Sequence, residues 1–349
     1  MHGASQHKFP AENLCIRLPR CYRAIDCTKL ISVNGQGLLR ERNLGVRNDA
    51  VAIGRRDVSE AVNASRRDLL RAAVIGGAGL AASAILPAYA EEAPLLKGNL
   101  KHSVARWTFP KHSVAELCGI VTSLGFAAID LVGPKDWPTL KAHGVFSSMC
   151  NGAELGLDKG FAGRQYHDEL VQRYTQLIDW VADAGYRNLI CFSGNRNGMD
   201  PDEGLANAEV GIKRILAHAE KRGVHLVMEL LNSKVDHPDY LCDHSAWGVE
   251  LCKRIGSDHF GLLYDIYHMQ IMEGDVIATI RQHHAWFKHY HTAGVPGRHE
   301  LGDDQELNYP AICRAIRDAG FTGYLAQEFI PTAPDPVRSL REAVRLCDV

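Results

Sequence analysis

From residue 100 to the C-terminus, short apolar runs alternate with longer stretches in which apolar residues recur at the helical period. Eight of the short runs have the length and composition of strands, near 102–107, 128–132, 144–149, 188–192, 225–229, 260–265, 287–291 and 324–328. Strands that alternate with helices build βαβ units around a parallel sheet. Because eight such units close into a barrel, the pattern predicts an α/β fold of the (β/α)8 TIM barrel class.

Several predicted helices stop at a glycine that leads into the next strand. The clearest examples are Val114 to Leu124, Asp168 to Ala184, Leu205 to Arg222 and Tyr309 to Ala319, followed by Gly125, Gly185, Gly223 and Gly320. An open, doubly wound sheet is the alternative, but no glycine-rich phosphate loop follows the first strand. The barrel is favoured, and residues 91–349 are close to the roughly 250 residues that such a domain needs.

An apolar run without charged residues, 72–90, precedes the predicted barrel and is rich in Ala and Gly. It follows the adjacent Arg66 and Arg67 and ends in Ala88-Tyr89-Ala90, a small-residue cleavage signal. Residues 61–90 therefore resemble a twin-arginine signal peptide, which predicts export by the twin-arginine translocase to the periplasm or the medium. An uncleaved inner-membrane anchor is the alternative, although the glycines in the run argue against it.

Residues 1–60 show no sustained period of a helix or a strand, and we predict an unstructured leader there. A signal peptide is expected to begin within a few residues of its arginines. Residues 1–60 are therefore either an unusual leader or lie upstream of the true start; we hypothesise a start at Val51 or Val58, which requires a GTG codon in the gene.

Composition and charge exclude some classes of function. Hydrophobic residues make up 46% of the chain, and 39 basic residues nearly cancel 41 acidic ones, leaving a formal charge of −2. This balance provides no basic surface for a phosphate backbone, so no nucleic-acid partner is predicted. The ten cysteines stand singly, without a C-x-x-C pair, which argues against structural zinc or a disulfide framework. We expect buried, reduced thiols, including Cys150 and Cys191 near predicted strand ends.

Polar residues stand at the ends of the last four predicted strands: Glu229, Asp265, His291 and Glu328. The carboxyl ends of the strands form the functional face of a TIM barrel, so these side chains are expected to converge. Three carboxylates in one dry site repel one another, and a divalent cation relieves that repulsion. Carboxylates with one imidazole suit Mg²⁺, Mn²⁺, Co²⁺ or Zn²⁺. The strand ends therefore predict a site for one divalent metal ion.

Several segments carry a family resemblance. The main ones are Asp265-Ile-Tyr-His268 with the residues up to Asp275, Pro296-Gly-Arg298-His-Glu300 followed by Leu307-Asn-Tyr309, and Gly323-Tyr-Leu-Ala-Gln-Glu328. The runs Lys101 to Trp107 and Asp130 to Trp137 look like the same group. They resemble hydroxypyruvate isomerases of the xylose isomerase-like barrel superfamily, and the likeness covers roughly residues 100 to 332. It implies that Glu229 and Glu328 are both metal ligands and the catalytic carboxylate pair, while Asp265 completes the cluster. His291 stands where hydroxypyruvate isomerases carry Gln and looks more like the ketose 3-epimerases.

Such enzymes move a proton beside a carbonyl through an enediolate, with one glutamate as base and the other as acid. In this interpretation His268 hydrogen-bonds a substrate oxygen and Arg298 holds a substrate carboxylate through its bidentate fork. The alternative for Arg298 is a solvent-facing loop charge. Trp107 is a candidate apolar wall of the substrate site, as is Trp137, although both could simply pack. His283 and His284 are adjacent on a helix and are expected to be surface residues.

The first functional hypothesis is thus an exported, metal-dependent isomerase of a small hydroxy-carbonyl substrate, with hydroxypyruvate to 2-hydroxy-3-oxopropanoate (tartronate semialdehyde) as the named reaction. A ketose or keto-sugar 3-epimerase on the same ligands is the second. A non-catalytic periplasmic sugar-binding barrel is a third, because an intact ligand set does not prove turnover. A nuclease of the related barrel group is disfavoured by the charge balance. The resemblance also suggests a homodimer.

Overall fold

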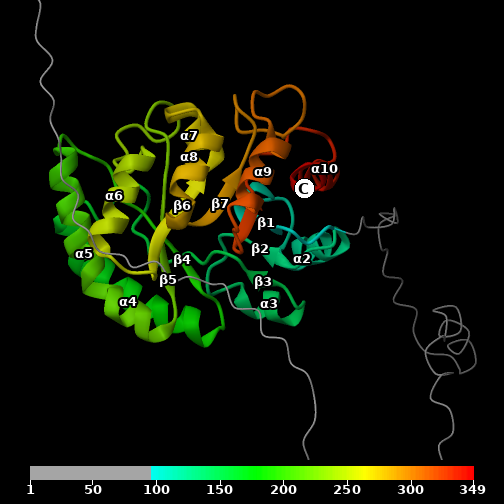
Figure 1. Ribbon diagram of the computed structural model, residues 1–349. Coiled ribbons are helices and arrows are strands. Elements are labelled where there is room, and N and C mark those ends of the chain that lie inside the picture. The colour runs from blue at the N-terminus through cyan, green and yellow to red at the C-terminus, as the bar shows by residue number, and fades with distance from the viewer. Residues whose placement is uncertain (1–95) are drawn as a thin grey trace, which may run out of the picture. The chain divides into compact units, whose positions relative to one another are not determined.

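The computed structural model describes residues 96–349. The predicted leader and signal peptide lie outside the described residues. Eight parallel strands stand in the centre: β1 (Lys101–Val104), β2 (Ala128–Ile129), β3 (Phe146–Ser147), β4 (Asn188–Cys191), β5 (His225–Glu229), β6 (Phe260–Asp265), β7 (Phe287–Thr292) and β8 (Tyr324–Gln327). Figure 1 shows them enclosed by helices. The predicted fold class is confirmed.

The strands close into a barrel in sequence order. One sheet has the order β1-β8-β7-β6-β5-β4, and β2 pairs with β3. Single parallel bridges complete the ring, Ala105 to Asp130 between the first two strands and Cys150 to Leu189 between the third and fourth. The register places Asp265 opposite His291, so the ends of β6 and β7 lie at the same level.

The second and third strands are shorter than the predicted runs 128–132 and 144–149. Leu131 has a positive φ of 55°, which a β-branched or bulky residue rarely adopts and which takes the chain out of extended conformation. The first strand also ends early. Arg106 N donates to Asp130 O, and the chain then turns into the 3-10 helix η1 (Arg106–Thr108), which contains Trp107.

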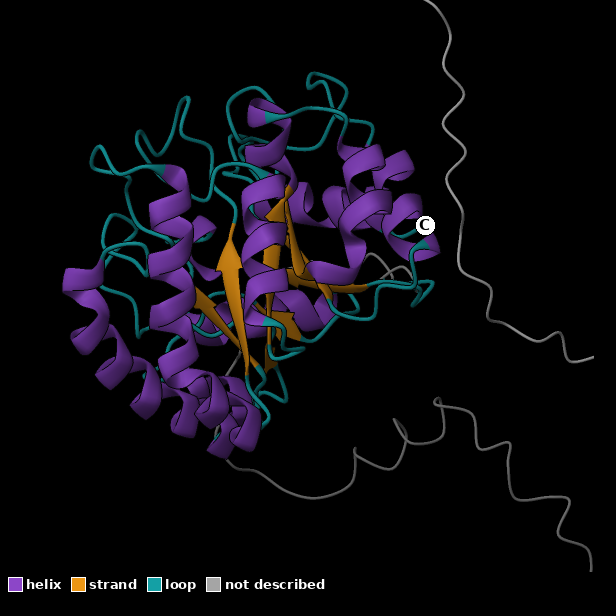
Figure 2. Cartoon of the chain, turned by 60° about the vertical axis from the view of Figure 1, so that its left-hand side comes forward, coloured by secondary structure: helices purple, strands orange, loops and turns teal. Residues whose placement is uncertain are grey.

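Helices form the outer layer (Figure 2). They are α2 (Val114–Ser123), α3 (Trp137–Ala142), α4 (His167–Asp183), α5 (Pro201–Arg222), α6 (Ser245–Ile255), α7 (Ile266–Met272), α8 (Val276–His283), α9 (Tyr309–Asp318) and α10 (Pro336–Cys347). The short 3-10 helices η2 (Arg164–Tyr166) and η3 (His284–Trp286) precede α4 and β7. Within residues 96–349, no helix is both long and apolar enough to cross a membrane.

The four helices that were predicted to stop at glycines do so within one or two residues. Gly223 shows the reason: its φ of 70° is the left-handed conformation that ends a helix, and its N–H donates to Ala219 O and Glu220 O at the end of α5. Val224 then leads into β5. The seven described cysteines are buried and free, as expected, and burial raises the pKa of the Cys150 thiol to about 12.

Candidate active site

The four predicted strand-end residues meet at one point. Ligand atoms of Glu229, Asp265, His291 and Glu328 all lie within 4.8 Å of one another, and all four residues are buried. His291 Nδ1 is the centre of the group, 2.7 Å from Glu328 Oε2, 3.3 Å from Glu229 Oε1 and 4.0 Å from Asp265 Oδ2. The predicted convergence is confirmed as geometry.

Each carboxylate is positioned by its strand and the turn that follows. Asp265 ends β6 and caps α7, because its Oδ1 accepts from Tyr267 N at 2.8 Å and His268 N at 3.3 Å. This leaves Oδ2 for the cluster. Glu328 follows β8, where its N–H donates to Thr292 O at 2.9 Å. The hydroxyl of Tyr240 donates to Glu229 O at 3.0 Å and fixes the end of β5.

His291 is held from behind by a carboxylate that the sequence interpretation did not assign to the site. Its Nε2 lies 2.8 Å from Asp130 Oδ2, while His289 Nε2 lies 2.9 Å from Asp130 Oδ1. Ser148 Oγ donates to the same Asp130 Oδ1 at 2.6 Å. With its Nε2–H engaged by Asp130, His291 presents Nδ1 to the cluster, and this buried nitrogen has no hydrogen-bond partner of suitable geometry among the described residues.

The site holds more acidic groups than basic ones. Burial raises the pKa of Asp265 to about 8, and burial together with the Glu328 charge raises the pKa of Glu229. Burial alone would also raise the pKa of Glu328, but His291, Arg298 and the Trp107 hydrogen bond hold that pKa well below its ordinary value. Likewise His289 and His291 outweigh burial and lower the pKa of Asp130. Without a further cation, the cluster has to take up protons.

The residues fit a divalent metal ion on their own chemistry. Three carboxylates and an imidazole nitrogen that has no hydrogen-bond partner within residues 96–349 point at one another inside the barrel, and this is the donor set of Mg²⁺, Mn²⁺, Co²⁺ or Zn²⁺ sites. Asp130 provides the carboxylate behind the imidazole that orients ligating histidines in metal sites. Glu229, Asp265, His291 and Glu328 are therefore the residues that could hold one ion.

Arg298 reaches into the site and is not a solvent-facing loop charge. Its guanidinium Nη2 lies 2.6 Å from Glu328 Oε2 and 3.2 Å from Asp265 Oδ2. The guanidinium carbon lies 5.2 Å from the ring centres of both Trp107 and Tyr267. Its backbone has a positive φ of 61°, held where Arg298 N donates to Gly294 O and Ile330 N donates to Arg298 O. Its role toward a substrate carboxylate stays a prediction.

His268 offers a hydrogen-bond donor to the site. Asn232 Oδ1 accepts from Val235 N and Asp236 N, so its Nδ2 faces His268 Nδ1 at 2.7 Å. Nδ1 is then the acceptor and Nε2 carries the proton, 3.5 Å from Asp265 Oδ2. Burial lowers the pKa of His268 well below its ordinary value, which keeps this ring neutral.

The two predicted tryptophans have different roles. Trp107 is 43% exposed at the site, and its Nε1–H donates to Glu328 Oε1 at 2.7 Å. Trp137 is buried in α3, donates to Val132 O at 2.8 Å and packs edge-on against Tyr186. The alternative of simple packing therefore holds for Trp137. His284 is exposed, as expected, and His283 is half-buried.

The fold and the site define a (β/α)8 barrel with an acidic cluster and one imidazole at the carboxyl ends of its last four strands. Residues 139–348, more than half of the chain, match the model of the xylose isomerase-like TIM barrel family. The chain belongs to this family.

Individual relatives agree with this assignment. A 2-oxo-tetronate isomerase of Cupriavidus necator is 36% identical over 115 residues, which are 33% of this chain and 44% of that protein. A putative hydroxypyruvate isomerase of Drosophila melanogaster is 30% identical over 236 residues, covering 63% of this chain and 86% of that protein. The chain thus spans less than half the length of the first relative. A solved structure described as an AP endonuclease of family 2 from Brucella melitensis is similar in fold, with a TM-score of 0.61, 24% identity and coverage of 69% of this chain and 97% of that one.

Proposed function

We propose that this protein is a metal-dependent isomerase that interconverts a small hydroxy-ketone and a hydroxy-aldehyde through an enediolate, with hydroxypyruvate and 2-hydroxy-3-oxopropanoate as the pair. The observation that carries the proposal is the buried cluster of Glu229, Asp265, His291 and Glu328. The names of the curated relatives, 2-oxo-tetronate isomerase and putative hydroxypyruvate isomerase, support the same reaction class.

The chemistry follows from the groups that surround the cluster. A divalent ion held by its four residues would supply positive charge that stabilises the enediolate. One glutamate of the pair Glu229 and Glu328 removes the proton from the hydroxyl-bearing carbon, and the other returns a proton to the former carbonyl carbon. A proton also moves between the two substrate oxygens. The Nε2–H of His268 hydrogen-bonds to one of these oxygens, and Trp107 covers the site toward solvent.

Isotope exchange tests this proposal. The protein is incubated in D₂O with Mg²⁺, Mn²⁺, Co²⁺ or Zn²⁺, and proton NMR follows hydroxypyruvate and a panel of ketoses. We expect deuterium to enter at the carbon beside the carbonyl, together with isomer formation, only when the ion is present. Metal-independent exchange contradicts the metal requirement. Stoichiometric metal without exchange on any compound favours a binding protein that has kept the barrel without turnover.

A ketose 3-epimerase is the second candidate, and two observations favour it. His291 occupies the position at which the resemblance places the epimerase ligand. In addition, Arg298 already contacts two carboxylates, so its charge is engaged before any substrate carboxylate arrives. A neutral sugar needs no cationic partner, whereas the carboxylate of a keto acid has to compete with Asp265 and Glu328 for the Arg298 guanidinium.

Substitution of Arg298 by Met separates the two candidates. A keto-acid substrate loses its charge-assisted partner, and we expect kcat/KM to fall about tenfold or more, mostly through KM. For a neutral ketose, kcat/KM should change much less. Steady-state kinetics on both substrates measures the difference, and R314M on the exposed face of α9 is the matched control. Unchanged turnover of the best substrate by R298M contradicts the keto-acid assignment.

Export by the twin-arginine translocase, location in the periplasm or the medium, and a homodimer belong to the same proposal. The sequence of residues 61–90 supports export. The alternative remains an inner-membrane anchor formed by the same segment.

A further inference from the structure

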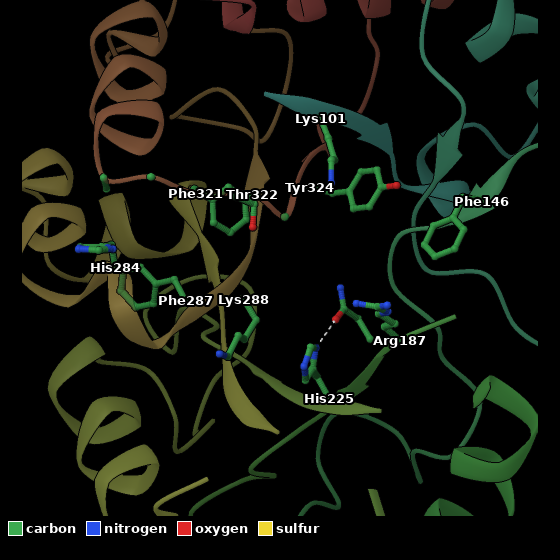
Figure 3. A pocket seen from close by; sticks show the side chains of 14 residues that line it. Lys101, Phe146, Arg187, His225, His284, Phe287, Lys288, Phe321, Thr322 and Tyr324 are labelled. Atoms are coloured by element: carbon green, nitrogen blue, oxygen red, sulfur yellow. Dashed lines mark hydrogen bonds between the residues drawn. The ribbon is translucent and has the colours of Figure 1, made fainter. Parts of the chain in front are cut away.

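A second concave site lies at the opposite end of the barrel from the acidic cluster. A cavity of about 570 Å³ opens where the strands begin (Figure 3). Its wall includes the first residues of six strands, Lys101, Phe146, Asn188, His225, Phe287 and Tyr324. The volume is in the range of small-molecule sites. The proposed reaction takes place at the other end of the barrel and does not involve this cavity.

The cavity wall is positively charged. Lys101, Arg187 and Lys288 line it together with two histidines, and no Asp or Glu is among the lining residues in the described part of the chain. In residues 96–349, none of these three cations forms an ion pair with a carboxylate. Lys101 Nζ lies over the ring of Tyr324 at 5.8 Å. Figure 3 shows the three side chains around the same opening. Cations on a protein surface usually have acidic neighbours or diverge into water, so three unpaired ones around one hollow indicate an anion site.

Small residues make room for this arrangement. A Cβ at Gly261 would lie 2.5 Å from Lys288 Cγ, so the lysine stem crosses β6 only because residue 261 is glycine. A Cβ at Gly323 would lie 2.9 Å from Lys288 O and 2.5 Å from the ring of Phe321. Any larger residue at either position would therefore displace Lys288 on β7 or the ring of Phe321.

His225 is a wall residue whose imidazole ring is held in one orientation. Asn188 Nδ2 donates to Ser148 O at 3.0 Å, which turns its Oδ1 toward His225 Nδ1 at 3.2 Å (Figure 3). The ring is thereby fixed in the cavity. Burial, His259 and the charges of Lys288 and Arg187 lower the pKa of His225 to about 4, against a smaller opposing effect of Asp258. The positive charges of Lys288 and Arg187 thus disfavour protonation of His225 inside the cavity.

We propose that this cavity binds a small polyanion, an oxyanion-bearing molecule with at least two negative charges. Lys101, Arg187 and Lys288 would neutralise the charges, and the Arg187 fork suits carboxylate and phosphate oxygens alike. The aromatic walls from Phe146 and Tyr324 reduce solvent around the ion pairs and strengthen them. Phosphate esters and polycarboxylates share this chemistry.

Calorimetric titration of the full chain with inorganic pyrophosphate and with citrate tests the site. The ionic strength is held constant with KCl, and no divalent ion is added because both probes chelate it. We expect saturable one-to-one binding of at least one probe. K288M keeps the apolar stem and removes one charge, and the Kd should rise about tenfold or more. K141M removes an equal charge from the exposed end of α3 and should leave the Kd unchanged.

The two probes distinguish the sources of the anion. Binding of pyrophosphate alone identifies a phosphate compound, binding of citrate alone identifies a polycarboxylate, and binding of both identifies a general polyanion site. R187Q provides a second test if K288M does not fold. Absence of saturable binding by either probe overturns the proposal, and so does a Kd that is equal in wild type and in the folded cavity variants. None of these readouts depends on isomerase activity.

Discussion

Replacement of Glu328 by Gln is expected to lower kcat for the proposed isomerisation by about 10²–10⁴-fold. Gln has nearly the same shape and can still accept the hydrogen bond from Trp107, but it neither accepts nor returns a proton. The variant also removes one of three carboxylates from the cluster and leaves Arg298 with Asp265 as its remaining carboxylate partner. Steady-state kinetics and deuterium exchange in D₂O measure the loss.

Metal content distinguishes the two causes of that loss. E328Q is assayed at saturating divalent ion, and the bound ion per chain is measured on the same sample. We expect kcat to stay low at full occupancy, because proton transfer is missing even when the ion is present. E203Q, on the exposed first turn of α5, is the matched control and should retain wild-type activity. Recovery of E328Q to wild-type kcat by excess metal would show that Glu328 is only a ligand.

The barrel and its acidic cluster could be predicted from the sequence because both depend on local periodicity. Each strand-end residue closes an apolar run, and parallel strands bring all such ends to one face. Glu229, Asp265, His291 and Glu328 therefore met as expected without any knowledge of tertiary contacts. The predicted run 128–132 is longer than the observed second strand, because the positive φ of Leu131 ends the extended conformation early. The alternation of apolar and polar residues carries no information about that backbone angle.

Residues that act through distant partners were harder to predict. Asp130 is separated from His291 by 161 positions, and only closure of the barrel brings them to 2.8 Å. Its signal in the sequence was a carboxylate inside the second predicted strand, a position that an apolar residue would normally occupy. The basic cavity was hard to predict for the same reason. Lys101, Arg187 and Lys288 stand singly near the starts of three strands, and only closure of the barrel brings them to one opening.

Replacement of Asp130 by Asn is expected to weaken divalent metal binding about 10- to 100-fold, although Asp130 is not among the four residues that could hold the ion. The buried carboxylate accepts hydrogen bonds from His291 Nε2 at 2.8 Å and Ser148 Oγ at 2.6 Å, and His289 Nε2 lies 2.9 Å from its Oδ1. Asn offers one oxygen for these donors and places an N–H₂ donor against at least one of them. The His291 ring then loses both its orientation and the negative charge that increases the basicity of Nδ1.

The measurement is a metal titration of wild type and D130N at one pH, followed by kcat at saturating ion. A positioning role predicts a raised metal Kd with most of kcat recovered at high metal, whereas a catalytic role predicts a low kcat at every concentration. D136N, seven residues from the end of β2, removes an equal charge from a side chain that forms no hydrogen bond or ion pair within residues 96–349. It should bind metal as wild type does. Since the donors that lose their acceptor are buried, D130N should also lower the free energy of unfolding by about 1–3 kcal/mol, measured by denaturant titration. Circular dichroism checks that the barrel persists under assay conditions. Equal metal Kd values for D130N and wild type would contradict the assignment of His291 as a ligand through Nδ1.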